Sequence, residues 1–448
     1  MRSSLALIAS PVASLVALLA ACRGAEHPRA GTAATFTIDV GKPGETLRGV
    51  AGDGNRVVFA RGDLASSEIE ARTGATLAWH VTLPASAGAL AMLPNRVAVA
   101  ISAGGSVTGI GAALDLHGEP SAAVVALDAA SGTIAWRIPF DATEFATITS
   151  LAPLDTGGLV VGGMFAGTLR VGDAASRGAQ PRDVVSSAGK SDGFVATLTA
   201  DGHLEWIVRV GGGGGDAVQG VAARGDRIAL AGTFSTGAEL LGEPLTAFDE
   251  RLPFSDGFVA ELDRSGARRW LQTFGGKDDD AVAGVAIDST GRVAVAATIR
   301  DTIRLDGKDL AARGDGDGLV AWFSPAGEPG ATAILGGSGF DGLRAIAAVD
   351  DRVIVAGFFH GALALGKRAL DSNHGDDSFL AVVDAAGAIE TTWHVAGPGR
   401  EEITALSAVP GGFVAGIAHT AELVIGADHL PAPADPASGA AVIGRPAP

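Results

Sequence analysis

The sequence predicts an all-β fold: a seven-bladed β-propeller with four antiparallel strands per blade, closed by the N-terminal strand, which completes the last blade. Three observations predict it. The segment Ser191–Leu198 returns in similar form at a period of about 60 residues, which is typical of a repeat architecture. The 65 glycines punctuate many short apolar runs, as in folds made of strands and turns. One strand that the last repeat lacks at the C-terminus is present at the N-terminus.

The unit from Asp216 to Gly275 shows the four strands most clearly. Turn residues separate short apolar runs, which we name strands A to D: residues 219–223, 227–234, 258–262 and 269–274. A loop of roughly 20 residues joins strands B and C, and Arg264-Ser265-Gly266 makes a tight turn before strand D. Four antiparallel strands repeated around an axis form a propeller blade.

Strands B and C each recur seven times. Strand B is expected at residues 57–60, 97–101, 159–163, 228–232, 293–297, 353–357 and 413–417. Strand C is expected at residues 68–71, 124–127, 194–198, 258–262, 319–323, 379–383 and 440–443. This count predicts the number of blades.

Strand D carries a tryptophan in the first four blades: Trp79, Trp136, Trp206 and Trp270. We expect these rings to pack between neighbouring blades, where a large side chain fills the widening space. The last copy of strand D is missing after Ile443, but residues 36–41 align with residues 206–211. The first strand is therefore expected to complete the last blade and leave no open sheet edge. The propeller is predicted at residues 35–444, followed by a tail at 445–448.

The N-terminus has the features of a secretory leader. Arg2 precedes an apolar stretch from Leu5 to Ala20, which is too short for a confident membrane span. The following Leu19-Ala20-Ala21-Cys22 resembles the lipobox of bacterial lipoproteins, which implies a signal peptide at 1–21 and lipidation of Cys22. Residue 23 is Arg rather than the Asp that marks inner-membrane retention, so the resemblance implies an outer-membrane lipoprotein of the cell envelope. Residues 22–34 are predicted to be a flexible tether.

Composition excludes some classes of partner. The formal net charge is −17, and the 33 lysines and arginines form no cluster, so nucleic acid is not an expected partner. Cys22 is the single cysteine, so no disulfide forms within the chain. We expect a monomer that meets the membrane through its lipid anchor.

The repeat resembles a known family. Asp256-Gly257-Phe258-Val259-Ala260, then a turn glycine, Trp270 and Gly275-Gly276 are similar to the bacterial β-propeller repeat of the SBBP type, and the likeness covers residues 150–420. In the earlier blades, residues 125–136 look more like the PQQ-type propeller repeat of quinoproteins and of an outer-membrane assembly lipoprotein. These resemblances imply a propeller in the envelope and no particular activity.

Acidic residues recur in the loops between strands D and A and between strands B and C, which emerge on one face of a propeller. They make this loop-rich face the candidate binding face: Asp192, Asp216, Asp256, Asp280, Asp317, Asp341, Asp377 and Glu401. Three interpretations remain open. The acids could bond their own turns, ligate Ca²⁺ or receive a cationic ligand. No cofactor other than Ca²⁺ is indicated.

The regular repeat favours a non-catalytic binding or scaffold module at the outer membrane, with an envelope protein or glycan as its partner. We find no catalytic constellation. Ser191 lies in a Gly-x-Ser-x-Gly pattern, but this pattern precedes a strand, whereas a nucleophile elbow joins a strand to a helix. Two alternatives remain. One is an envelope enzyme, such as a polysaccharide lyase, a hydrolase or a quinoprotein, that uses the acidic face. The other is a scaffold of outer-membrane protein assembly.

Overall fold

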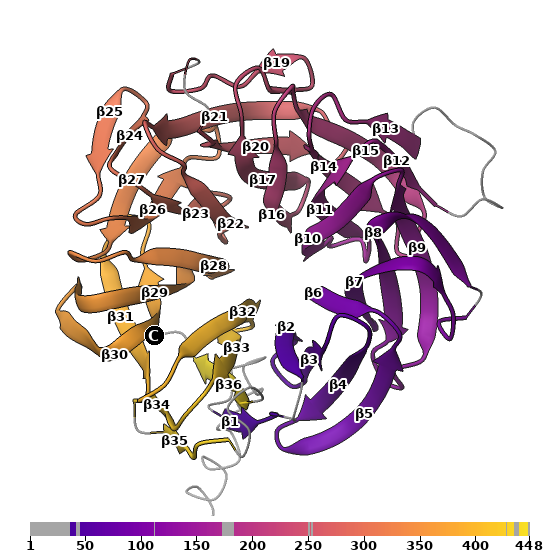
Figure 1. Ribbon diagram of the computed structural model, residues 1–448, viewed down its shortest axis with the longest axis horizontal. Coiled ribbons are helices and arrows are strands. Elements are labelled where there is room, and N and C mark those ends of the chain that lie inside the picture. The colour runs from indigo at the N-terminus through magenta and orange to yellow at the C-terminus, as the bar shows by residue number, and fades with distance from the viewer. Residues whose placement is uncertain are drawn as a thin grey trace, which may run out of the picture.

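The computed structural model describes residues 36–41, 45–111, 113–172, 183–249, 251, 254–426, 428–433 and 439–446. The strands form sheets arranged radially around a central axis (Figure 1). The predicted signal peptide, the tether and Cys22 lie outside the described residues. Within the described residues, no helix has the length and apolar character needed to cross a membrane.

The first three sheets follow one another along the chain. The first contains β2 (Thr46–Gly52), β3 (Val57–Gly62), β4 (Ser67–Thr73) and β5 (Thr76–Leu83). The second contains β6 (Ser86–Leu93), β7 (Arg96–Val107), β8 (Leu114–Asp128), β9 (Ile134–Ala142), β12 (Thr168–Val171) and β13 (Val184–Ser186). The third contains β10 (Phe145–Pro153), β11 (Leu159–Ala166), β14 (Asp192–Leu198), β15 (Leu204–Gly211), β18 (Glu239–Leu240) and β19 (Glu243–Pro244).

The next three sheets continue the pattern. The fourth contains β16 (Ala217–Arg224), β17 (Arg227–Phe234), β20 (Asp256–Asp263), β21 (Arg268–Gly276), β24 (Thr302–Leu305) and β25 (Lys308–Ala311). The fifth contains β22 (Ala281–Ile287), β23 (Val293–Ile299), β26 (Asp317–Phe323) and β27 (Pro329–Leu335). The sixth contains β28 (Gly342–Val349), β29 (Arg352–Leu365), β30 (Arg368–Val383), β31 (Ile389–Ala396), β34 (Leu423–Ile425) and β35 (Asp428–Leu430).

The remaining sheet is composite. It combines β32 (Glu401–Val409), β33 (Gly412–His419) and β36 (Gly439–Pro446) with β1 (Phe36–Asp39) from the other end of the described chain. β1 pairs antiparallel with β36, with Phe36 opposite Gly444 (Figure 1). The N-terminal strand thus closes the ring at the predicted place. β36 runs to Pro446, two residues into the stretch predicted as a tail.

The all-β propeller is confirmed, but the predicted fold class, a seven-bladed propeller with four antiparallel strands in each blade, is wrong. Every predicted B and C strand lies inside an observed strand, but the sheets are not alike. Six of them take their four core strands from one continuous stretch of chain, and the seventh is shared between the chain ends. Moreover, four of the sheets have six strands rather than four.

The additional strands come from the long loops between strands B and C. In four sheets this loop folds into a short hairpin that reaches back and pairs with the outermost strand of the preceding sheet; an example is β24–β25, which pairs with β21. In two others the B and C strands themselves lengthen into a long hairpin, β7–β8 and β29–β30. Both arrangements satisfy the backbone groups of a long loop, and the first also covers the edge strand of a neighbouring sheet.

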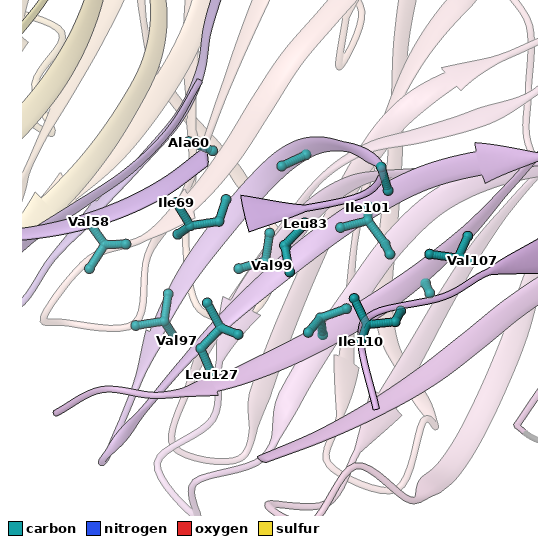
Figure 2. Close-up of a cluster of buried hydrophobic side chains, with 14 of the residues drawn as sticks. Val58, Ala60, Ile69, Leu83, Val97, Val99, Ile101, Val107, Ile110 and Leu127 are labelled. Atoms are coloured by element: carbon teal, nitrogen blue, oxygen red, sulfur yellow. The ribbon is translucent and has the colours of Figure 1, made fainter. Parts of the chain in front are cut away.

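Neighbouring sheets share apolar cores. Figure 2 shows the core between the first two sheets, where Val58, Ile69 and Leu83 meet Val97, Val99 and Leu127. All ten residues labelled in Figure 2 are buried: Val107 is 3% exposed, and the others are 2% exposed or less. β-branched and leucine side chains on the two facing sheets interdigitate, so burial stabilises the contact between blades rather than each blade alone.

The strand-D tryptophans lie at these same contacts, as predicted. Each indole faces the C–D turn glycine of the next sheet, and the pairs are Trp79–Gly132, Trp136–Gly202, Trp206–Gly266 and Trp270–Gly327. The indole N–H groups of the first three donate hydrogen bonds to backbone carbonyls of that next sheet, those of Ala129, Ala200 and Arg264, at 2.9, 2.9 and 3.0 Å. These glycines have φ between +74° and +85°, which favours glycine, and any Cβ would press on the ring.

Candidate functional site

The eight candidate acids are buried rather than displayed on the loop face. Their exposed fractions are between 0 and 4%, for Asp192, Asp216, Asp256, Asp280, Asp317, Asp341, Asp377 and Glu401. A buried carboxylate is stable only when nearby donors replace its lost hydration. The structure shows which groups do so for most of them.

The acids that open strand C accept hydrogen bonds from the loop before them. The backbone N–H groups of Ala188, Phe248 and Arg313 donate to Asp192, Asp256 and Asp317 at 2.9, 2.6 and 2.7 Å. Asp377 instead contacts the His394 ring at 2.7 Å. Asp192, Asp256 and Asp317 therefore hold the end of the long B–C loop against the start of strand C, as an Asp in a turn commonly does.

The acids of the D–A loops join two sheets. Asp216 accepts N–H groups from Gly212, which follows β15, and from Ser235, which follows β17, at 2.8 and 2.6 Å. Asp341 likewise accepts N–H groups from Gly337 and His360. One carboxylate thus links the residue after strand D of one sheet to the end of strand B in the next sheet.

The two classes of acid meet in pairs. The N–H groups of Asp216, Asp280 and Asp341 donate to the carbonyls of Ser191, Ser255 and Gly316, the residues just before the strand-C acids. The paired acids are Asp192 with Asp216, Asp256 with Asp280, Asp317 with Asp341 and Asp377 with Glu401. In the described part of the chain, no three His, Cys, Asp or Glu side chains are grouped so as to hold a metal ion.

Burial raises the pKa of several of these carboxyls. The pKa of Asp280 rises to about 7, chiefly through burial and further through the charge of Asp256. The pKa of Glu401 also rises to about 7, through burial and then the charge of Asp377. Two carboxylates this close and this buried favour a proton on one of them. Asp280 and Glu401 therefore exchange a proton near neutrality while they link neighbouring sheets.

The first sheet replaces the acid pair by an ion-pair cluster. Arg61, only 2% exposed, contacts Glu45 at 2.6 Å, Glu68 at 2.8 Å and also Glu70. Glu68 pairs in register with Arg61, whereas the acid of a later sheet, Asp256, pairs with an apolar residue, Phe234. Sequence reasoning missed this arginine because it occupies a position that is apolar elsewhere.

A second arrangement, not predicted from the sequence, lies in the central channel. In all seven innermost strands the pairing with strand B slips once, which leaves an additional residue in a β-bulge. Bulges re-aim side chains and are common beside functional sites. The bulged residues all line one end of the channel, and we call them the bulge ring: Arg48, Gly88 with Ala89, Thr149, Gln219, Ala283, Arg344 and Thr404.

The channel at the bulge ring has a volume of about 420 Å³. It continues as a space of about 290 Å³ lined mainly by aliphatic side chains, among them Met92, Leu151, Val221, Ile287 and Leu406. A cavity with polar groups at one end and apolar walls at the other is the usual form of a small-molecule site.

Most polar side chains of the bulge ring already have partners. The Thr149 hydroxyl donates to the Val218 carbonyl at 2.6 Å, and Gln219 exchanges two hydrogen bonds with Thr233 at 2.9 Å. Thr404 donates to the Gly416 carbonyl at 3.4 Å. These side chains stiffen the wall of the channel.

The two arginines differ from the rest of the ring. Arg344 forms an ion pair with Glu402 at 3.3 Å, and its guanidinium lies 4.8 Å from the centre of the Phe358 ring. Arg48 has a buried Nε without a hydrogen-bond partner, and within the described residues it makes no ion pair. The sequence spacing could have indicated both arginines. Arg48 stands three residues after Glu45, the acid of the first D–A loop, and Arg344 stands three residues after Asp341.

Comparisons with known proteins add little. No family model matches the chain, and no curated protein matches it. The chain is similar to the Dos1 propeller, with 10% identity over 92% of this chain and 94% of that one, and a TM-score of 0.43. It is also similar to quinohemoprotein alcohol dehydrogenase ADHIIG from Pseudomonas putida HK5 (13% identity, 89% of this chain, 68% of that one, TM-score 0.40). A third similar structure is the PL25 ulvan lyase (11% identity, 86% and 91%, TM-score 0.46).

Likenesses of this degree carry no functional argument. The architecture rests instead on the pairing of the strands themselves, which establishes an all-β propeller. The resemblance of the repeat to the SBBP type stays a prediction.

Proposed function

We propose that this chain is a non-catalytic binding or scaffold propeller of the cell envelope, held at the outer membrane through a lipidated Cys22. One observation carries the proposal: the carboxylates that recur in the blades are buried and occupied in holding loops and sheets together. The repeated carboxylates, which an acid-base mechanism would need, thus have a structural role in this fold.

The surfaces that remain for a partner are the loops and the channel. Propeller loops vary without disturbing the sheets and are commonly where binding residues lie. The channel adds a cavity with arginines at one end. Both features suit recognition of an envelope protein or glycan, and neither requires a membrane-spanning segment.

The anchor is tested by changing Cys22 to Ser and separating membranes from soluble protein. The expected result is loss of the chain from the membrane fraction, because serine lacks the thiol that carries the lipid in the predicted modification. Ser10→Ala, which leaves the lipobox intact, is the matched control and should remain with membranes. An unchanged distribution of Cys22→Ser would contradict the lipid anchor.

The non-catalytic role is tested with the purified full chain. We expect no quinone absorbance, no bound metal and no turnover on a panel of envelope polysaccharides. Turnover that is abolished by substitution of a channel or loop residue would show an enzyme and overturn this part of the proposal.

A further inference from the structure

We infer that the bulge ring binds the anionic group of a small molecule, a carboxylate or a phosphate, between Arg48 and Arg344. This inference rests on the proposed binding function and names its ligand class. It places the ligand in the central channel rather than at the acids of the loop face.

The fold brings the two arginines to equivalent positions. Arg48 is the bulged residue of β2 and Arg344 that of β28, and the bulged residue of the intervening strand β32 is Thr404. β2 and β28 both lie beside β32 in the ring. The three side chains therefore stand at one level of the channel in three successive sheets, on one side of its wall.

The charges at this level favour an anion. Arg48 has no ion pair among the described residues, and its buried Nε lacks an acceptor. A buried donor without an acceptor is costly, so an incoming anion oxygen would recover that cost. The acids near the two arginines are engaged elsewhere as well: Asp63, whose charge interacts with Arg48, accepts the N–H groups of Ala65 and Ser66, and Glu402 is shared by Arg344 and Arg400.

Arginine is suited to this task. Its planar guanidinium offers parallel N–H groups that match a carboxylate or a phosphate, and it remains charged at any physiological pH. Arg344 is held over the face of Phe358, which restricts the movement of its guanidinium before a ligand arrives.

The size of the channel indicates a small molecule. About 420 Å³ at the bulge ring accommodates an organic acid or a phosphorylated metabolite, and the aliphatic walls beyond it suit a less polar remainder. The expected ligand thus has an anionic end at the arginines and an apolar part deeper in the channel.

The experiment is a calorimetric titration of the purified full chain at fixed ionic strength, with inorganic phosphate in one arm and citrate in the other. Arg48→Ala and Arg344→Ala should each weaken binding about 10- to 100-fold, as expected for loss of a charge-assisted contact. Arg48→Lys keeps the charge and should retain part of the affinity. Whichever of phosphate and citrate binds more tightly shows whether the site prefers a phosphate or a carboxylate group.

Arg304→Ala is the charge-matched control. Arg304 lies on β24, half exposed, and pairs with Asp309 outside the channel, so its loss should leave binding unchanged. Thermal unfolding of every variant excludes misfolding as the cause, and Arg48→Gln replaces Arg48→Ala if the alanine variant unfolds. Wild-type affinity in folded Arg48 and Arg344 variants, no binding in either arm, or equal weakening by Arg304→Ala would each overturn the inference. Because the titration does not involve the membrane anchor, its failure would leave the test of Cys22 unaffected.

Discussion

At the scale of the residue, the repeated acids are the most informative feature of this chain. Asp280 is 2% exposed, accepts the N–H of Arg300 at 3.2 Å and lies beside a second acid, Asp256. Its Oδ2 is buried and has no partner among the described residues. A carboxyl in such surroundings keeps its proton to a higher pH than one in an unfolded chain.

This property predicts that the protein loses stability as pH rises from about 4.5 to 7. The pKa of Asp280 and that of Glu401 are raised to about 7 in the folded chain, from ordinary values near 4. Between these limits the folded state binds more protons than the unfolded state, so the free energy of unfolding falls with rising pH. The stabilisation is complete below pH 4 and is lost above pH 7.

Thermal unfolding across this pH range checks the prediction. Asp280→Asn should make the decline shallower, because an amide cannot release a proton. Asp249→Asn is the control: Asp249 is half-buried and its pKa is lowered to about 2 by Arg251, so it titrates below the range. An identical pH profile for wild type and Asp280→Asn would contradict the assignment.

At the scale of the element, each of the first four blades contacts the next through a strand-D tryptophan that packs against a turn glycine. Trp270 of β21 contacts the turn at Gly327, whose φ is +85°. A Cβ at residue 327 would lie 2.4 Å from the indole Cγ, well inside contact distance. The turn and the ring therefore fit only while this residue is glycine.

Gly327→Ala is expected to lower the free energy of unfolding by about 1–3 kcal/mol more than Gly307→Ala, measured by urea denaturation. Both glycines have positive φ, so both variants suffer backbone strain, but a Cβ at Gly307 meets no atom within 4 Å. The difference between the variants thus isolates the overpacking against Trp270. Equal losses would show that backbone strain alone is responsible.

Prediction from the sequence succeeded for elements with a repeated apolar pattern. Strands B and C are continuous buried runs, such as Val353–Gly357 within β29, and such runs with turn signals are recognisable without a structure. The hairpins β18–β19 and β24–β25 were not predicted, because strands of two to four residues carry no periodicity.

The candidate site was less predictable. The sequence repeat predicts that Asp280 lies in a loop. Its burial, however, depends on contacts between separate sheets, which no local sequence pattern encodes. The bulge that turns Arg48 and Arg344 toward the channel is a slip of register, and register is set by pairing with another strand.

At the scale of the whole molecule, the ring is closed by four residues from one end of the chain. β1 adds to β36 in the sheet that also contains β32 and β33, and every other sheet draws its core strands from continuous sequence. Without β1, the strand β36 would present an unpaired edge at the seam.

A chain that begins at Glu45 is therefore expected to unfold at a lower temperature than one that begins at residue 35, and to self-associate through the exposed β36. Differential scanning calorimetry and light scattering over a range of concentrations measure the two effects. If both chains melted together and stayed equally monomeric, β1 would contribute nothing to closure.

The acids hold the propeller together, and the proposed ligand chemistry lies in the channel. X-ray diffraction from crystals soaked in selenate, measured at the selenium absorption edge, tests this division of roles because it locates the bound anion. We expect an anomalous peak in the channel between Arg48 and Arg344 that disappears in Arg48→Ala. Selenate bound only outside the channel, or a channel peak unchanged by that substitution, would contradict it.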